Sequence, residues 1–129
     1  MLDHIGFSVS NVKASRLFYE KALKPLGIRM VMEVTPEMTG SDDSHFGFGN
    51  EFKPFFWIGS GKKRVTGLHV AFAADSRKIV DEFYAAAIAA GGKDNGKPGV
   101  RPHYHENYYG AFVFDPDGNN VEAVCHKPK

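Results

Sequence analysis

The 129-residue sequence has little of several features that mark specialised classes of protein. Cys125 is its single cysteine, which excludes an internal disulfide and favours a reducing compartment. No apolar run approaches the roughly 20 residues that a membrane-spanning helix needs. The N-terminus carries Asp3 where a signal peptide has a basic residue, and no apolar stretch follows it. We therefore expect a cytoplasmic protein.

The sequence also lacks an excess of charge of either sign. Lys and Arg together number 16 and Asp and Glu 15, so the formal net charge is +1. This balance gives no electrostatic reason to expect a nucleic acid or an anionic membrane as a partner. Hydrophobic residues make up 43% and charged residues 24% of the chain, which is ordinary for a globular protein and excludes a largely disordered one.

An internal repeat is the most informative feature of the sequence. The tetrapeptide His4–Phe7 is similar to His69–Phe72, at an offset of 65 residues. At this offset, residues 3–28 and 68–93 share seven identities in 26 ungapped pairs. Because a repeat of this length decides the architecture, we expect two similar modules.

Each half of the repeat begins with a strand followed by a helix. Alternating apolar residues predict strands at Ile5–Val9 and Leu68–Phe72, and the opposite face of each begins with a histidine and continues with small residues, which leaves it hollow. Helical spacing predicts helices capped by Asn11 and by either Asp75 or Ser76. The inward-facing residues of the two helices are expected to be Ser15, Phe18, Ala22, Leu23 and Leu26, and Ile79, Val80, Phe83, Ala87 and Ile88.

The remainder of each half is predicted to contain short strands. They are expected at residues 31–34, 46–48, 55–58, 111–114 and 121–124. Residues 39–44 form a polar loop in this interpretation, and Asp115–Asn119 is a strong turn sequence. Each half is thus a strand, a helix and about three strands. We predict an α+β fold of one domain over residues 1–129, with modules at about 1–62 and 63–129.

Two histidines and one carboxylate are candidates for a metal site. His4 and His69 are equivalent in the repeat, and Glu122 alternates with residues expected to pack under a helix, so all three side chains should point into the hollow. Imidazole nitrogen and carboxylate oxygen together suit Fe, Mn, Ni, Co or Zn, and three ligands leave positions open for substrate. The alternative is two hydrogen-bonded histidines and a solvated glutamate.

The repeat also assigns a counterpart to the candidate acidic ligand. The offset of 65 residues pairs Glu122 with Trp57. Because side chains alternate along a strand, Trp57 should face the hollow while its neighbours Phe56 and Ile58 face the helix. We therefore expect Trp57 to form an apolar wall for a bound substrate. The alternative is that Trp57 is a core residue.

A segment dense in donors, acceptors and aromatic rings precedes the last two strands, as is typical of segments that line binding sites. Arg101 is a candidate to hold a substrate carboxylate or phosphate. His105 or Tyr104 is a candidate to transfer a proton. Tyr108 and Tyr109 are expected to contact the substrate. The alternatives are a solvated turn for the histidine and core packing for the tyrosines.

Together these residues resemble the vicinal oxygen chelate superfamily, which includes glyoxalase I, bleomycin-resistance proteins and extradiol dioxygenases. The resemblance is carried by His4–Gly6, Phe18–Lys21, His69–Val70 and Asp115–Glu122. It implies paired βαβββ modules that form a cupped mixed sheet, with helices on the outer face. It also implies a divalent metal on the two histidines and Glu122, a small-molecule substrate, and a homodimer whose site is often at the subunit interface.

The resemblance leaves several activities open. Glyoxalase I has a fourth ligand, a Glu or Gln, at the place where this sequence has Trp57, or Phe56 if the register slips. Our first hypothesis is a glyoxalase-like lyase or isomerase in which Glu122 is a ligand and a catalytic residue. The second is an Fe(II)-dependent ring-cleaving dioxygenase. The third is a metal-free drug-binding protein of the bleomycin-resistance type, with Trp57 and tyrosines lining the hollow.

Overall fold

A computed structural model describes residues 1–63 and 65–129 of the chain. The first half contains β1 (Ile5–Ser8), α1 (Val12–Ala22), the 3-10 helix η1 (Lys24–Leu26), β2 (Arg29–Val34), the short α2 (Pro36–Thr39), β3 (His45–Gly49) and β4 (Phe56–Gly59). The second half contains β5 (His69–Ala73), α3 (Arg77–Ala89), β6 (Lys93–Val100), β7 (Tyr109–Phe114) and β8 (Asn120–Cys125). Each half is therefore a βαβββ module.

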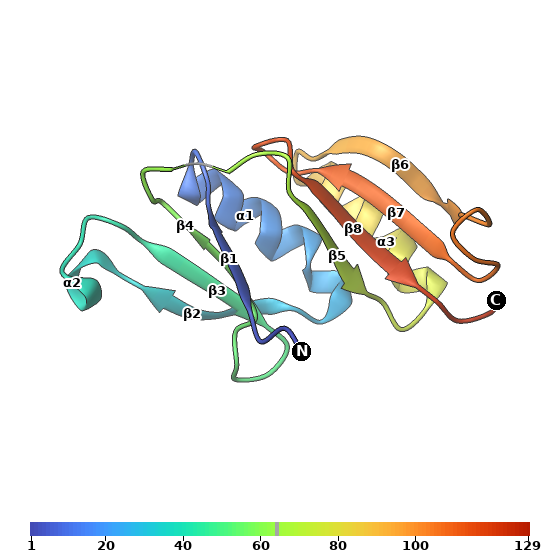
Figure 1. The fold of residues 1–129 in the computed structure, drawn as a ribbon, viewed down its shortest axis with the longest axis horizontal. Coiled ribbons are helices and arrows are strands. Elements are labelled where there is room, and N and C mark those ends of the chain that lie inside the picture. Colours follow the sequence, from blue (N-terminus) through green and yellow to red (C-terminus); the bar gives the residue numbers. More distant parts are fainter. Residues whose placement is uncertain (64) are drawn as a thin grey trace.

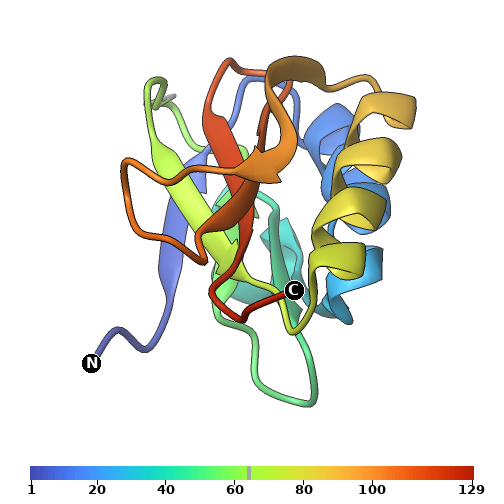
Figure 2. The same cartoon turned by 90° about the vertical axis from the view of Figure 1, so that its right-hand side faces the viewer.

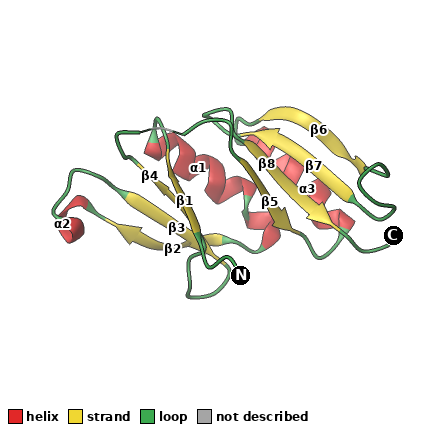
Figure 3. Cartoon of the chain, viewed as in Figure 1, coloured by secondary structure: helices red, strands yellow, loops and turns green. Residues whose placement is uncertain are grey.

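The strands form two four-stranded mixed sheets, one in each module (Figures 1 and 3). The strand orders β1-β4-β3-β2 and β5-β8-β7-β6 are equivalent, and in both modules the first strand pairs in parallel with the last. The long helices α1 and α3 lie together on one side of the sheets (Figure 2). The predicted α+β class with two repeated modules is confirmed.

The sheet register supports the sequence repeat residue by residue. Gly6 is opposite Trp57 in the first sheet, and Ala71 is opposite Glu122 in the second. Both members of the second pair are 65 positions after those of the first, so the predicted equivalence of Trp57 and Glu122 is confirmed. The five shorter predicted strands agree with β2, β3, β4, β7 and β8 to within two residues at either end.

Side-chain caps begin both long helices. Asn11 Oδ1 accepts a hydrogen bond from the backbone N–H of Ala14 at 3.0 Å, as the sequence predicts. Of the two candidates for the second cap, Ser76 performs the role, because its hydroxyl accepts from the N–H of Ile79 at 3.2 Å. Within residues 1–63 and 65–129, no helix is long and apolar enough to cross a membrane.

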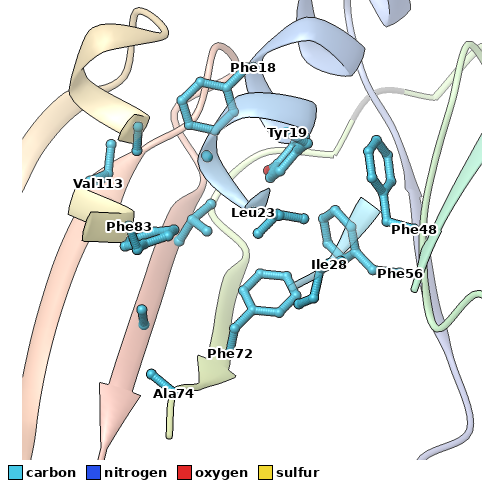
Figure 4. Packing of buried hydrophobic residues seen from close by; sticks show 14 of the residues in the cluster. Phe18, Tyr19, Leu23, Ile28, Phe48, Phe56, Phe72, Ala74, Phe83 and Val113 are labelled. Atoms are coloured by element: carbon cyan, nitrogen blue, oxygen red, sulfur yellow. The ribbon is translucent and has the colours of Figure 1, made fainter. Parts of the chain in front are cut away.

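Aromatic side chains join the two modules into one core (Figure 4). The buried Phe56 ring lies edge-on to Phe7 in its own sheet, to Tyr19 on α1 and to Phe72 in the second module, at centroid distances of 5.6, 4.9 and 5.3 Å. Burying a side chain of this size stabilises the fold by about 1.5–3 kcal/mol. The inward-facing residues of the helices match the prediction with two exceptions. Ile88, in the last turn of α3, is predicted to face inward but is exposed. Tyr19 is buried, although the sequence pattern does not select it.

The predicted turn before β8 also connects the modules. The Asp115 carboxylate accepts hydrogen bonds from the backbone N–H groups of Asp117 and Asn119, at 2.9 and 2.8 Å, and from the Asn119 side chain at 3.1 Å. Its fourth donor is the buried Tyr19 hydroxyl on α1, at 2.6 Å. Burial, and then the charge of Asp115, raise the pKa of Tyr19 well above its ordinary value.

Two elements are absent from the sequence prediction. Strand β6 has the polar sequence Lys-Asp-Asn-Gly-Lys-Pro-Gly-Val, which shows no alternation of apolar residues. It forms through pairing with β7, with irregular register between Asp94 and Gly96 and between Gly96 and Gly99. The other element is α2, whose last residue, Thr39, begins the segment predicted as a polar loop.

Candidate functional site

Each sheet has a hollow on the face directed away from the helices. The first hollow has a volume of about 680 Å³ and is lined by His4, Gly6, Val34, His45, Lys53, Pro54 and Trp57. The second hollow has a volume of about 590 Å³ and is lined by His69, His103, Tyr104, His105, Tyr108, Phe112 and Glu122. Most of the predicted candidates are thus divided between two cavities, one in each module.

Glu122 is at the centre of the second hollow. Its neighbours on β8, Val121 and Ala123, pack into the core, so strand alternation directs the carboxylate to the other face. Glu122 is 0% exposed, whereas the side chain of His69, at the start of β5, is 54% exposed. Glu122 Oε1 is 2.8 Å from His69 Nε2, and Oε2 accepts a hydrogen bond from the Tyr108 hydroxyl. Both carboxylate oxygens therefore have partners, which offsets the cost of burying them.

Tyr108 is held in its protonated form by these surroundings. Burial, and then its hydrogen bond to the Glu122 carboxylate, raise the pKa of Tyr108 well above its ordinary value. A tyrosine is protonated at neutral pH in any case, and the raised pKa extends the protonated form further into the alkaline range. The Tyr108 hydroxyl is therefore a hydrogen-bond donor to Glu122.

His105 and Tyr104 lie at the rim of the second hollow. His105 Nδ1 accepts a hydrogen bond from the backbone N–H of Asn107 at 3.1 Å, which places the proton of the neutral ring on Nε2. That Nε2 is 2.7 Å from His126 Nδ1. The Tyr104 ring is 58% exposed and lies 4.8 Å from the Tyr108 ring, edge-on. Both candidates for proton transfer therefore lie against the ring of Tyr108, whose hydroxyl is bonded to Glu122.

His4 lies at the edge of the first hollow together with Trp57. His4 Nδ1 is 2.8 Å from an oxygen of Asp3, and the other oxygen of Asp3 is paired with Lys53. The hydrogen bonds from Lys53 and then from His4 lower the pKa of Asp3. With a proton on Nδ1, the Nε2 atom of His4 is left as an acceptor or a ligand. The Trp57 indole packs over Gly47, where a Cβ atom would lie only 2.9 Å from the ring.

The predicted metal-ligand triad is not assembled within one chain. Across residues 1–63 and 65–129, no group of three or more His, Cys, Asp or Glu side chains is close enough together to hold a metal ion. His69 and Glu122 meet, as predicted, but His4 borders the other hollow. The sequence indicates the face on which each side chain lies, but not that the two faces belong to separate sheets.

The structure places the remaining two candidates outside the second hollow. Arg101 lines a smaller adjoining pocket. The Tyr109 hydroxyl donates to Asp81 on α3 at 2.6 Å, and its ring lies 5.1 Å from the Arg77 guanidinium. Tyr109 therefore faces the helix layer, because neighbouring residues on a strand point to opposite faces and Tyr108 faces the hollow.

Two residues at or beside the second hollow were missed by sequence reasoning although a signal for each exists. Phe112 is opposite Glu122 in the ladder between β7 and β8, and it forms a wall of the second hollow. His126 has the same parity as Glu122 and contacts His105. Alternation counted from Glu122 would have identified His126, and alternation counted from Tyr108 would have identified Phe112.

Comparison with known proteins identifies the family. The sequence profile of the Glyoxalase/Bleomycin resistance protein/Dioxygenase superfamily matches residues 1–123. The chain belongs to this superfamily. No curated protein sequence matches the chain significantly.

Solved structures of this superfamily have the same fold. A glyoxalase/bleomycin resistance protein from Albidiferax ferrireducens T118 is 29% identical, with a TM-score of 0.74 over 95% of this chain and 97% of that one. A glyoxalase/bleomycin resistance protein/dioxygenase family enzyme from Burkholderia phytofirmans PsJN is 19% identical, with a TM-score of 0.69 over 98% of both chains. A V278E mutant of glyoxalase I from Zea mays is 24% identical, with a TM-score of 0.70 over 95% of this chain but 45% of the plant protein.

Proposed function

We propose that this protein is a metal-dependent enzyme of its superfamily, a glyoxalase-like lyase or isomerase that acts on a small oxygenated substrate. His69 and Glu122 of one subunit and His4 of a second subunit would hold the ion. The observation that carries the proposal is the convergence of His69 Nε2 and Glu122 Oε1, which are 2.8 Å apart in the second hollow.

The donor atoms suit a divalent transition metal. Imidazole nitrogen and carboxylate oxygen each bind such ions at about 2.0–2.2 Å, so two ligands of one ion lie about 3 Å apart. The pair formed by His69 and Glu122 has this spacing. The Tyr108 hydroxyl orients Glu122 through its other oxygen, and Asp3 orients His4 through Nδ1. Hydrogen bonds of this kind fix a ligand and its tautomer.

A homodimer would complete the site. The first hollow supplies one proposed ligand, His4, and the second supplies the other two, His69 and Glu122, so neither cavity holds the complete set. Two-fold symmetry would place the first hollow of one subunit against the second hollow of its partner, and would do so twice. Trp57 would then form an apolar wall opposite Glu122.

The chemistry follows from the residues that surround the ion position. A bound divalent metal supplies Lewis-acid stabilisation of negative charge on adjacent substrate oxygens. Tyr108 holds Glu122 in place, and Glu122 is the candidate base. His105 holds a proton on Nε2 against His126, and Tyr104 presents its hydroxyl at the rim, so these two residues are candidates for exchanging protons with the substrate.

Two other functions have specific support. Two histidines and one carboxylate, with Trp57 in place of a fourth ligand, suit an Fe(II)-dependent ring-cleaving dioxygenase. The aromatic side chains Trp57, Tyr104 and Tyr108 suit a drug-binding protein that stacks on a planar ligand without a metal.

Elemental analysis of protein purified without chelator tests the proposal. We expect close to one ion of Fe, Mn, Ni, Co or Zn per subunit, and at least a tenfold lower content in His69→Ala. His45→Ala is the matched control, because His45 lines the first hollow but is not a proposed ligand. Iron would favour the dioxygenase, and nickel or zinc the glyoxalase type. Metal-free protein that binds a planar drug tightly, or full metal content in His69→Ala, would contradict the proposal.

A further inference from the structure

A small pocket adjoins the second hollow and has no part in the proposed metal chemistry. It has a volume of about 290 Å³ and shares three lining residues with the second hollow, namely His103, Tyr104 and Phe112. Its own residues are Asn95, Gly96, Arg101 and Asn120. A group bound in this pocket would therefore be continuous with a ligand in the second hollow.

Arg101 is held firmly in this pocket without being neutralised. One terminal nitrogen of its guanidinium donates to the Gly99 carbonyl at 2.8 Å, and the other donates to the Lys97 carbonyl at 2.7 Å. Carbonyl oxygens fix the group but carry no full charge. In the described part of the chain, Arg101 takes part in no ion pair, and no Asp or Glu lines the pocket. The pocket is therefore positively charged.

The irregular strand β6 is shaped around this guanidinium. A Cβ atom at Gly96 would lie 3.2 Å from one terminal nitrogen of Arg101, and a Cβ atom at Gly99 would lie 3.1 Å from the other. Both contacts are tighter than nine in ten real Cβ contacts, and at Gly96 a Cβ atom would come closer still to the Phe112 ring, at 2.9 Å, so the two glycines allow β6 to pass close to both side chains. The two register shifts in β6 occur at these same glycines.

The guanidinium keeps enough donors to bind a ligand. It has five N–H groups, and the two carbonyls use two of them. The Phe112 ring lies 5.4 Å from the guanidinium carbon and covers the group from one direction. Asn120 Oδ1 accepts from the Asn95 side chain at 3.1 Å, which leaves the Asn120 amide N–H₂ as a further donor. Donors of this kind, in a pocket without carboxylates, suit an anion.

We infer that Arg101 forms a subsite for an oxyanion, a carboxylate or phosphate group on a small organic ligand whose remainder extends into the second hollow. Phe112 is the shared wall, since its ring centroid lies 5.4 Å from the Arg101 guanidinium and 6.3 Å from the His69 ring. Binding of the oxyanion needs no metal. Only the identification of this ligand as the substrate rests on the proposed function.

Calorimetric titration of chelator-treated protein with three ligands that share one ring tests this inference. Benzoate and phenylphosphate carry an oxyanion, and benzyl alcohol is the neutral counterpart. At constant low ionic strength, we expect at least one of the oxyanions to bind roughly tenfold or more tightly than the alcohol. Whichever of the two binds more tightly identifies the group as carboxylate or phosphate.

Three variants assign the binding to Arg101. Arg101→Gln should remove the preference for the oxyanion, and Arg101→Lys should retain part of it, because lysine keeps the charge but loses the planar fork. Lys93→Gln is the matched control, because it removes a charge from β6 at a residue that does not line the pocket, and it should leave affinity within about twofold. Circular dichroism establishes whether each variant folds. If Arg101→Gln does not fold, the oxyanion affinity of Arg101→Lys, compared with that of the wild-type protein, tests the role of Arg101.

The outcomes of the two proposals can be told apart. His69→Ala should lose metal yet keep its affinity for the oxyanion, whereas Arg101→Gln should lose the oxyanion yet keep metal. Equal affinity of the wild-type protein for all three ligands would overturn the inference, as would equal losses in Lys93→Gln and Arg101→Gln.

Discussion

If one metal site is shared between two subunits, two defective variants should restore each other. His4→Ala removes the ligand of the first hollow, and His69→Ala removes a ligand of the second. Homodimers of either variant have two incomplete sites. In a hybrid dimer, one site combines both defects and the other is intact, because two-fold symmetry pairs each first hollow with the partner's second hollow.

The size of the effect follows from this geometry. A hybrid dimer has one complete site of two, so its metal content should be about half that of the wild-type dimer. Co-expression of the two variants with different affinity tags, and purification through both tags, isolates the hybrid. Metal per dimer is then measured by elemental analysis, and the dimer is verified by size-exclusion chromatography with light scattering.

A pairing that leaves at least one defect in every site provides the control. His4→Ala combined with the His4→Ala/His69→Ala double variant should contain no more metal than either alone, because His4 is missing from both subunits. The reasoning is refuted if the hybrid dimer of the two single variants contains as little metal as the homodimer of either one, while the wild-type dimer is loaded with metal. A hybrid with full wild-type content would refute it equally.

Two further predictions concern stability, each measured by urea denaturation. Tyr108→Phe should lower the free energy of unfolding by about 1–3 kcal/mol, because it leaves one oxygen of the buried Glu122 carboxylate without a donor. The control, Tyr104→Phe at the exposed rim, should change the free energy of unfolding by less than about 0.5 kcal/mol. Equal effects of the two substitutions would contradict a contribution of the Tyr108 hydrogen bond to stability. The second prediction is a loss of stability at high pH. The pKa of Tyr19 is raised in the folded state, so its contribution to stability is complete below the unfolded value of about 10 and declines as the pH rises above it. Tyr19→Phe should remove this part of the pH dependence, and an unchanged alkaline profile in that variant would refute it.

The sequence predicts most of the fold because the repeat and strand alternation are local signals. The equivalence of Trp57 and Glu122 follows from the offset, and the observed registers, with Trp57 opposite Gly6 and Glu122 opposite Ala71, agree with it. Strand β6 has no such signal, because its shape depends on pairing with β7 and on a side chain that comes after it in the sequence, Arg101.

The candidate site is predictable only in part, for a related reason. Alternation indicates that His4, His69 and Glu122 lie on sheet faces directed away from the helices. It does not indicate the distance between two sheets, so alternation alone does not predict the separation of His4 from the other two, and only the resemblance, with its site often at a subunit interface, allows for it. Alternation does exclude Tyr108 and Tyr109 from facing the same cavity, and the aromatic composition of the segment obscured this.

The hydrogen bond from Tyr19 to Asp115 means that the duplicated halves are not interchangeable parts. A fragment that ended before residue 63 would retain the Tyr19 hydroxyl without its acceptor and the Phe56 ring without Phe72. Neither half is therefore expected to be stable when expressed alone, although each has a complete βαβββ topology. A chimaera in which one half comes from a relative is expected to fold only if its first half has the tyrosine at the position of Tyr19 and its second half has the aspartate at the position of Asp115.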